Sequence, residues 1–393
     1  MKIYHLIENL DDSYGGPAKS VPNLVQNLKK LNVEDHLLSI KIHKLEKNEV
    51  IKNNNLNWLS FRYEYLKKLR YSSDLKNYLT KTAEKQKNVI FHAHNLWNNI
   101  PYLTYKLSQK YKIPYILSSR GALYPWSLSQ NSFQKKIAWS FFQKDALNNA
   151  TCIHATNVSE LRAIRNIGIL SPIALIPNGI NLNEFKFNMS KNSSRKKLGL
   201  KTDRKYILFF SRIHPKKGLE YLVESWIKIS NKFPNWNLLI VGPVEDQKYY
   251  SSIQKKLNNH NLNGRTFLRG MLKNEKRLHC FNSSDLFILP SHTENFGIAI
   301  AEAMASKLPV ITTHGTPWQV IQRYNAGWWV KLSQKNIDRA IREALSSSDV
   351  DLKKKGINGY KIIKDYEWKY QAKKMKKVYK WMLEQEKKPD FIF

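Results

Sequence analysis

Short apolar runs alternate with longer amphipathic stretches along most of the chain, a pattern typical of parallel sheets whose strands are joined by helices. Residues 20–30 and 102–111, for instance, show the three- and four-residue spacing of helices. The apolar runs between such stretches are short enough for buried strands. In the first half they predict strands at 3–7, 37–40, 89–93, 115–118, 152–155 and 174–176.

A second cycle of the same kind begins at Tyr206 and predicts strands at 207–210, 238–241, 266–268, 286–289 and 310–312. Between the cycles, residues 181–203 are polar and rich in Asn and Ser, which favours a linker. We therefore expect an α/β protein with two doubly wound, Rossmann-like parallel-sheet domains. Their expected bounds are 1–185 and 186–365, and a lysine-rich helical segment follows at 366–393.

The 65 Lys and Arg residues outnumber the 31 Asp and Glu residues, and the formal net charge is +34 in 393 residues. Such an excess favours anionic partners, namely phosphorylated ligands, anionic lipid or nucleic acid. The charge is spread over both halves without a run of five or six basic residues, so we do not expect a nucleic-acid-binding arm. A lysine-rich solvent shell accounts for part of the excess.

The two cysteines, Cys152 and Cys280, both lie in apolar contexts. They exclude a disulfide framework, offer no metal-ligand spacing and fit a reducing cytoplasm. A predicted strand follows Met1 directly, so no signal peptide is expected. No apolar run approaches the roughly 18 residues that a bilayer-spanning helix needs, and any contact with a membrane is expected at its surface.

A loop between a predicted strand and a predicted helix, at 286–305, carries the first candidate chemistry. Glu294 lies in this loop, and Glu302 lies inside the helix. At the carboxyl edge of a parallel sheet, such carboxylates suit the hydroxyls of a bound sugar, although two solvated glutamates would show the same spacing. The first helical turn adds unpaired N–H groups that suit an anion or a hydroxyl. These groups belong to Phe296, Gly297 and Ile298.

Arg212 and Lys217 follow the first predicted strand of the second domain. Two cations at the carboxyl end of a parallel strand suit a diphosphate, which Arg grips through a planar fork and Lys as a point charge. In so basic a chain, such a pair also arises without a function. No Asp-x-Asp motif follows a predicted strand, so a metal-independent site is expected.

Weaker candidates follow the strands of the first domain. Gly15 and Gly16 precede a predicted helix, where a glycine pair makes a phosphate or sugar cradle or an ordinary turn. His94, Trp97 and Arg120 follow later strands and are candidates for the acceptor side. His94 is expected to point toward an acceptor, although it could simply complete its strand end. In the second domain, Trp318 is a candidate aromatic lid over a bound sugar.

Glu294 and Glu302, with Asn295-Phe296-Gly297 between them, resemble the E-x7-E signature of the family 4 retaining glycosyltransferases, which have the GT-B fold. Ser211-Arg212 and Lys217-Gly218 resemble the Arg-x4-Lys-Gly motif of the same family. The resemblance covers nearly the whole chain and is strongest from 206 to 313. The sequence departs from the family pattern at Arg120, where many members carry His, so a histidine role there does not transfer.

The resemblance implies two domains that face each other across a cleft, with the last helix crossing back to the first domain. It assigns catalysis to Glu294, Arg212 and Lys217, of which the two cations neutralise the leaving nucleoside diphosphate. Glu302 would hold the ribose hydroxyls, and the glycine loop would cover the diphosphate. The donor-binding set implied in this way is Gly15, Gly16, Asn295, Phe296, Gly297, Ile298 and Glu302.

The expected reaction is the retaining transfer of a sugar from a nucleotide sugar, with UDP as the favoured nucleotide, to a glycan or lipid-linked glycan in cell-envelope polysaccharide synthesis. In this family the departing phosphate oxygen is thought to take the proton of the acceptor. No cofactor or metal is expected, and no nucleic acid partner. We expect a cytoplasmic protein at the inner face of the plasma membrane, where residues 62–71 are the candidate contact with anionic lipid.

Two other classes remain open at this point. One is a GT-B enzyme with different chemistry, such as a nucleotide-sugar epimerase or a sugar phosphorylase. The other is a nucleic-acid-binding protein, which only the charge suggests. The sequence does not indicate which sugar is moved, which acceptor receives it, or what oligomeric state the protein has.

Overall fold

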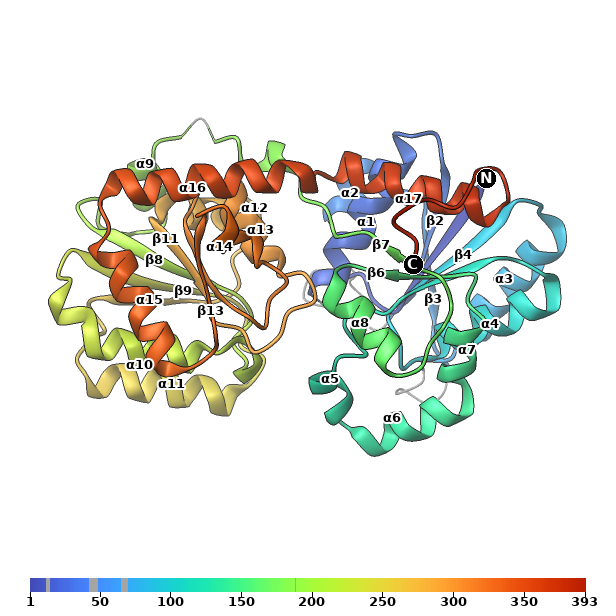
Figure 1. Cartoon of the computed structure of the whole chain (residues 1–393), viewed down its shortest axis with the longest axis horizontal. Helices are drawn as coiled ribbons and strands as arrows, with labels where there is room; N and C mark the ends of the chain where they lie inside the picture. The colour runs from blue at the N-terminus through green and yellow to red at the C-terminus, as the bar shows by residue number, and fades with distance from the viewer. Residues whose placement is uncertain (12–14, 42–48, 65–69, 188) are drawn as a thin grey trace. The chain divides into compact units, whose positions relative to one another are not determined.

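The computed structural model describes residues 1–11, 15–41, 49–64, 70–187 and 189–393. These residues form two compact units, each built on its own parallel sheet (Figure 1). Unit 1 contains Met1–Gly179 together with Trp368–Phe393, and unit 2 contains Ile180–Glu367. The last segment of the chain therefore belongs to the same unit as the first.

The described part of unit 1 contains a seven-stranded, all-parallel sheet in the order β3-β2-β1-β4-β5-β6-β7. Its strands are β1 (Lys2–Ile7), β2 (Glu34–Lys41), β3 (Trp58–Arg62), β4 (Val89–His94), β5 (Tyr115–Ser118), β6 (Cys152–Ala155) and β7 (Ile173–Leu175). Its helices are α1 (Gly16–Lys29), α2 (Glu49–Asn54), α3 (Ser73–Lys85), α4 (Asn99–Tyr111), α5 (Pro125–Ser129), α6 (Ser132–Ala138), the π-helical turn η2 (Trp139–Gln143), α7 (Lys144–Asn148), α8 (Val158–Asn166) and α17 (Trp368–Met382).

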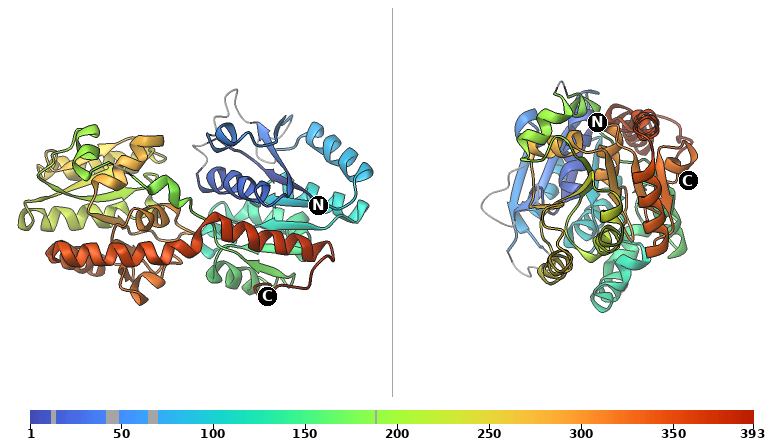
Figure 2. Two further views of the ribbon diagram at one scale, coloured as in Figure 1. Left: turned by 90° about the horizontal axis from the view of Figure 1, so that it is seen from above. Right: turned by 90° about the vertical axis from the view of Figure 1, so that its left-hand side faces the viewer.

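Each strand of unit 1 sends alternate side chains to opposite faces of the sheet. Ile3 lies in the core on one face, and its neighbour Tyr4 lies in the core on the other. The helix α17 packs beside α1 on the face of Ile3, where it buries Met375 and Val378 (Figure 2). The residues at 391–393 then hydrogen-bond to β7, which closes that edge of the sheet.

The described part of unit 2 contains a six-stranded, all-parallel sheet in the order β10-β9-β8-β11-β12-β13. Its strands are β8 (Lys205–Phe210), β9 (Trp236–Val241), β10 (Thr266–Arg269), β11 (Leu286–Leu289), β12 (Val310–Thr313) and β13 (Gly327–Val330). Its helices are η3 (Leu182–Phe185), α9 (Lys191–Lys197), η4 (Pro215–Lys217), α10 (Leu219–Ile229), η5 (Ser230–Lys232), α11 (Gln247–Asn259), α12 (Asn274–Ser283), α13 (Ile298–Ala305), α14 (Val320–Arg323), α15 (Gln334–Ser346), α16 (Asp349–Ile363) and η6 (Lys364–Tyr366).

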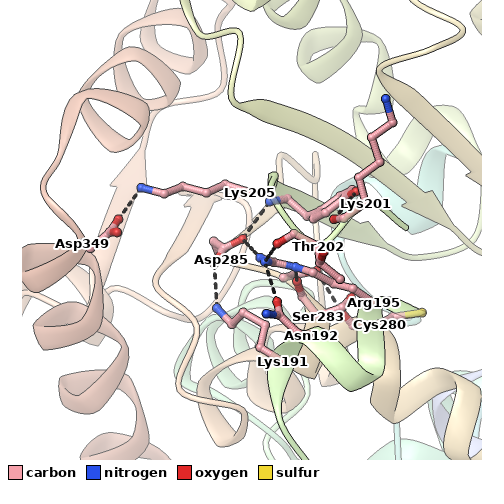
Figure 3. A network of polar contacts seen from close by, with 12 residues as sticks. Lys191, Asn192, Arg195, Lys201, Thr202, Lys205, Cys280, Ser283, Asp285 and Asp349 are labelled. Atoms are coloured by element: carbon pink, nitrogen blue, oxygen red, sulfur yellow. Dashed lines mark hydrogen bonds and ion pairs between the residues drawn. The ribbon is translucent and has the colours of Figure 1, made fainter. Parts of the chain in front are cut away.

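The segment 181–203, expected as a linker, instead carries η3 and α9 and folds as part of unit 2. The buried Arg195 of α9 donates to Asp285 Oδ2 at 2.8 Å and to the carbonyl oxygen of Thr202 at 3.0 Å (Figure 3). Lys191 approaches the other carboxylate oxygen of Asp285 at 2.6 Å. This network holds α9 against Asp285, the residue directly before β11. A buried guanidinium needs such partners, because an unpaired charge in the core is costly.

The expected strands are all present, and the sheets have two further strands, β3 and β13. Both are outermost strands whose residues are only partly buried or exposed. An outermost strand has a neighbour on one side only, so it need not show the continuous apolar run that marks a central parallel strand.

Strand order reverses between β1 and β4 in unit 1 and between β8 and β11 in unit 2. In open parallel sheets, ligands bind outside the carboxyl ends of the strands at such a point. Among the described residues, no helix has the combination of length and apolar character needed to cross a bilayer.

Candidate functional site

Two loops of unit 2 meet at the point where its strand order reverses. One loop joins β8 to α10, and the other joins β11 to α13. The backbone N–H of His292 donates to the carbonyl oxygen of Lys216 at 2.9 Å, which ties the loops together. Gly218 has φ +66°, and a Cβ on it would lie 2.0 Å from the carbonyl oxygen of Pro290. Glycine is therefore required for this close approach of the two loops.

Lys217 and Glu294 form an ion pair across these loops, with Nζ 2.5 Å from Oε1. Both side chains are largely buried, and Ser291 Oγ also donates to the same carboxylate at 2.9 Å. Burial alone would raise the pKa of Glu294, but the charge and hydrogen bond of Lys217 hold that pKa below its usual value. The carboxylate is thus kept ionised and can accept hydrogen bonds from hydroxyl groups.

Arg212 follows β8 and extends to the surface, where its Nη1 lies 2.7 Å from Glu245 Oε1. Since both side chains are more than 40% exposed, this pair contributes little to stability and can separate readily. Burial, followed by the charge of Lys217, lowers the pKa of Lys216 to about 8, and Arg212 adds to this effect. Three cationic side chains therefore share one electrostatic environment, which is suited to an anion that carries more than one charge.

Trp318 packs against the loop before α13 and hydrogen-bonds to its backbone. Its Nε1 donates to the carbonyl oxygen of Phe296 at 2.5 Å, and the two rings lie 5.2 Å apart. In a trans peptide the carbonyl and the following N–H point in opposite directions, so this bond directs the N–H of Gly297 away from Trp318. Gly297 has φ +78°, and no side chain caps α13, which begins at Ile298. The N–H groups of the first helical turn are thus available to a ligand.

Glu302 is buried on α13 and forms an ion pair with Arg277 of α12. The other terminal nitrogen of Arg277 donates to Glu184 Oε2 at 2.8 Å. Burial opposes the charge of Arg277, but the two glutamates raise its pKa above the usual value. Glu302 is therefore held by different residues from those that hold Glu294. Asn295, which lies between the two glutamates in sequence, is partly buried.

In unit 1, Arg120 begins a chain of hydrogen bonds that ends at Asp35. Arg120 Nη2 lies 3.1 Å from His94 Nδ1, His94 Nε2 lies 3.1 Å from His5 Nδ1, and His5 Nε2 lies 2.9 Å from Asp35 Oδ1. Because a guanidinium only donates, Nδ1 of His94 must accept. Nε2 of His94 therefore donates to Nδ1 of His5, and Nε2 of His5 donates to Asp35. Both histidines thus carry their proton on Nε2. Burial raises the pKa of Asp35, while the hydrogen bond from His5 opposes that rise.

A second chain of hydrogen bonds runs beside the first and joins α17 to the sheet. His154 Nε2 donates to the carbonyl oxygen of Ile176 at 2.8 Å, so its Nδ1 accepts from Ser118 Oγ at 2.9 Å. Ser118 then accepts from His92 Nε2 at 2.7 Å, and His92 Nδ1 accepts from the hydroxyl of Tyr379 at 2.7 Å. Burial raises the pKa of Tyr379 well above its usual value, which keeps this hydroxyl a donor.

Burial keeps His92, His94 and His154 neutral. It is the first cause that lowers the pKa of His154 to about 3, and it holds the pKa values of His92 and His94 well below their usual range. The cationic Arg120 adds to the effect at all three rings. Neutral imidazoles are required here because protonation would turn each accepting nitrogen into a donor.

Among the described residues, His5, His92 and His94 form the one group close enough to share a metal ion. Each of them, however, already accepts a hydrogen bond at Nδ1, and the guanidinium of Arg120 lies against the group. A divalent cation would have to displace those donors and approach a positive charge. The arrangement therefore favours a hydrogen-bond relay over a metal centre.

The other candidates of unit 1 lie near this relay or at its edge. His94, which was expected to point toward an acceptor, is fully buried, and its two ring nitrogens contact Arg120 and His5. Arg120 also donates from Nη1 to Asn178 Oδ1 at 2.9 Å and to Ser20 Oγ at 3.0 Å. Trp97 is partly buried, and its Nε1 donates to a backbone carbonyl oxygen at 3.3 Å.

Gly15 adopts φ +96° directly before α1, and a Cβ there would meet none of the described residues within 4 Å. Gly16 is exposed and begins the helix. The space around Gly15 is thus open to a ligand, and its conformation favours glycine. Of the candidate membrane contact at 62–71, residues 65–69 lie outside the described residues.

Sequence reasoning missed several residues that position the candidates. Trp318 was expected as a lid but is 1% exposed and braces the backbone instead. Asp35 and His5 support Arg120 from strands far away in sequence, and Arg277 supports Glu302 from a neighbouring helix. In the sequence, such a positioning residue is visible only as an aromatic or charged side chain beside an apolar run. This signal does not identify the residue that it contacts.

Two family models match the chain. Residues 190–380 match the model described as "Glycosyl transferases group 1", and residues 14–184 match the model "Glycosyltransferase Family 4". Together the two matches span most of the chain.

An uncharacterized glycosyltransferase of Methanocaldococcus jannaschii is 29% identical over 223 residues, which cover 54% of this chain and 55% of that protein. The UDP-Gal:alpha-D-GlcNAc-diphosphoundecaprenol alpha-1,3-galactosyltransferase of Escherichia coli is 26% identical over 302 residues, which cover 73% of this chain and 75% of that protein. The chain spans between about two fifths and just over half the length of the first curated relatives it matches.

A solved structure of Anabaena HepE in complex with UDP and glucose superposes with a TM-score of 0.77 at 16% identity, over 96% of this chain and 99% of that chain. At this identity the likeness concerns the fold, and both parallel-sheet domains match the GT-B architecture. The E-x7-E loop, the Arg-x4-Lys-Gly loop and the two family matches agree, and the chain belongs to the family 4 glycosyltransferases of the GT-B fold.

Proposed function

We propose that this protein transfers a sugar from a nucleotide-sugar donor to a glycan or lipid-linked glycan acceptor, with retention of the anomeric configuration. The observation that carries the proposal is the buried ion pair of Lys217 and Glu294 beside the uncapped start of α13. A cation that can bind phosphate, a carboxylate that can bind hydroxyls and the N–H groups of a helix start thus lie within one pair of loops. Each of these groups has a counterpart in a nucleoside diphosphate sugar.

In this proposal the diphosphate of the donor is bound by Lys217 and Arg212. Arg212 leaves its exposed partner Glu245 and grips the phosphates through its planar fork. The departing nucleoside diphosphate gains negative charge, and cations already in position stabilise that charge without reorganisation. Side chains thus supply the neutralisation, which supports catalysis without a metal ion.

The carboxylate of Glu294 and the N–H groups of Phe296 and Gly297 would hold the sugar, and Glu302 would hold the ribose hydroxyls. The bond from the anomeric carbon to the phosphate oxygen breaks, and a bond to the acceptor oxygen forms on the same face. The proton of the acceptor hydroxyl passes to the departing phosphate oxygen, so no protein base is needed. Gly15 and Gly16 are further donor-binding residues of this proposal, since a Cβ on Gly15 would meet none of the described residues within 4 Å.

UDP is the nucleotide we propose, since it is the nucleotide named for the Escherichia coli galactosyltransferase and for the HepE complex. The first of these acts on a lipid-linked sugar diphosphate, as its name states. We propose an acceptor of the same class for unit 1, with Arg120 near its anionic part and Trp97 nearby. For such an acceptor we propose that the protein acts in the cytoplasm at the inner face of the membrane, in cell-envelope polysaccharide synthesis.

Thermal shift of the full chain with UDP, GDP and ADP tests the donor site. We expect one nucleotide to raise Tm, because a ligand that binds only the folded state stabilises it. Arg212→Ala should abolish the shift, whereas Glu245→Ala, which only frees Arg212, should keep it. Glu294→Gln should lower kcat by about 10² to 10³ while the nucleotide still binds. Equal shifts for the wild-type protein and Arg212→Ala would overturn the assignment.

A further inference from the structure

A continuous helical segment of unit 1, formed by α6, η2 and α7, leaves large apolar side chains uncovered. Phe133 is 75% exposed, Phe141 is 78% exposed and Ile137 between them is 45% exposed. Their four-residue spacing places them along one side of the segment. In the described part of the chain most other aromatic side chains are buried or partly buried, so two such exposed phenylalanines on one helical face need an explanation.

The opposite side of the same segment is fixed to the core of unit 1. Ala146 and Leu147 are fully buried, and Trp139 packs against the same core. The buried Gln143 accepts a hydrogen bond from the backbone N–H of Trp97 at 3.2 Å. The segment is therefore anchored to unit 1 through η2 and α7, whereas α6 buries none of its residues and lies beside α5 at the edge of unit 1 (Figure 1).

The charges around this face are positive. Between 125 and 149 the chain has three lysines and one acid, Asp145. Lys136 and Lys144 are exposed, whereas Lys135 is partly buried and donates a hydrogen bond to the carbonyl oxygen of Ser127. An apolar strip with cations beside it matches the acyl boundary and headgroups of an anionic bilayer. A second copy of the chain would bring a further +34 and like-charged lysines to the same contact, so association of two copies is disfavoured.

We infer that the face formed by Phe133, Ile137 and Phe141, with Lys136 and Lys144, is the surface by which unit 1 docks on an anionic membrane. The inference rests on the proposed function in one respect, because the lipid-linked acceptor proposed above lies in a membrane. It assigns the contact to residues other than 62–71. The phenylalanines enter the headgroup region, the lysines contact anionic headgroups, and the helix lies parallel to the bilayer plane.

Flotation of the full chain with vesicles tests this inference. The vesicles are phosphatidylcholine alone, or phosphatidylcholine with phosphatidylglycerol, at low and at high salt. We expect binding to the anionic vesicles that weakens with salt. Phe133→Gln combined with Phe141→Gln should reduce the partition coefficient at least tenfold, because burial of each phenylalanine is a large part of the attraction. Lys136→Glu combined with Lys144→Glu should remove the preference for anionic vesicles.

Leu170→Gln is the matched control, because Leu170 is 83% exposed on unit 1 but lies in the loop between α8 and β7 and is not part of α6, η2 or α7. It should bind vesicles as the wild type does. Equal flotation of the wild type and the double glutamine variant would overturn the inference. A second result would also overturn it. If sedimentation showed that the wild type is a dimer and the double glutamine variant a monomer, while both floated equally, the face would be a contact between two copies of the chain.

The nucleotide-dependent Tm shift separates this inference from the proposed function. The double glutamine variant should keep the shift of the wild type, because no residue of the donor site is changed. A wild-type protein that floats without any nucleotide shift would leave the docking surface standing and contradict the proposed transferase.

Discussion

Arg120 donates a hydrogen bond from Nη2 to Nδ1 of His94 at 3.1 Å, and this contact determines where the protons lie in the core of unit 1. Since the guanidinium cannot accept, His94 must donate to His5, and His5 must donate to Asp35. Arg120, which is proposed for the acceptor side, is therefore linked to Asp35 through the imidazoles of His94 in β4 and His5 in β1. Sequence reasoning treated His94 and Arg120 as separate candidates, whereas they act as one unit.

His94→Phe should destabilise the protein by about 2 kcal/mol or more. The ring of phenylalanine fits a similar volume but leaves a donor of Arg120 and an acceptor of His5 without partners in the core. His94→Gln is the control, because its amide can accept from Arg120 and donate to His5. Urea denaturation at pH 7.5 measures both free energies of unfolding, and equal losses for the two variants would contradict the relay.

Stability should fall as the pH drops below about 6.5, the usual pKa of histidine. The folded-state pKa values of His92, His94 and His154 are lowered, so the unfolded chain binds protons that the folded chain does not. Each of these histidines contributes stability that is fully present above pH 6.5 and is lost as the pH falls, by about 1.4 kcal/mol per pH unit. For His154 this loss continues to a pH of about 3.

Free energies of unfolding at several pH values between 5 and 7.5 test this slope. His154→Gln can keep both hydrogen bonds of His154 without titrating. It should lower the slope by about 1.4 kcal/mol per pH unit. A slope identical to that of the wild type would show that His154 does not titrate as its burial implies.

Binding of the nucleoside diphosphate should be accompanied by proton uptake near pH 8. The pKa of Lys216 is about 8 in the free protein, and a nearby diphosphate would raise it. At pH 8 we expect an uptake of about half a proton per ligand, and less at pH 7, where Lys216 is already mostly charged. Calorimetry in buffers of different ionisation enthalpy gives this number directly. Lys216→Gln should bind the ligand without the uptake.

Trp318→Phe should weaken donor binding with little change in fold. The smaller ring fills most of the site but cannot donate to the carbonyl oxygen of Phe296, so the peptide before Gly297 loses its fixed direction. We expect KM for the donor to rise about fivefold to tenfold, as expected for one lost hydrogen bond of about 1 kcal/mol or slightly more. Trp328→Phe, whose Nε1 bonds to the exposed Glu343, is the control and should leave KM unchanged.

The central strands could be predicted from the sequence because they are buried on both faces, as at 286–289 and 115–118. The outermost strands β3 and β13 could not, since their side chains are only partly covered and their apolar pattern is weak. The nature of 181–203 was also hidden. Its polar composition resembles a linker, and only the distant Asp285 gives Arg195 a place inside unit 2.

Motif spacing likewise identified Lys217 and Glu294 without indicating that they pair directly. Spacing along the chain gives the order of the loops at a sheet edge but not which side chains touch across them. The residues that position a site, such as Trp318 and Arg277, are found only when their partners are known. They lie in separate elements and carry no motif of their own.

The place of α17 and of 391–393 in unit 1 has a consequence for synthesis on the ribosome. The face of the first sheet that contains Ile3 is only partly covered, by α1, until Met375 and Val378 are made, after the whole of unit 2. Although domains of a nascent chain commonly fold from the amino end, here the earlier unit should complete its core last. A stop codon before Trp368 would therefore harm the opposite end of the polypeptide, leaving an apolar sheet surface open to aggregation.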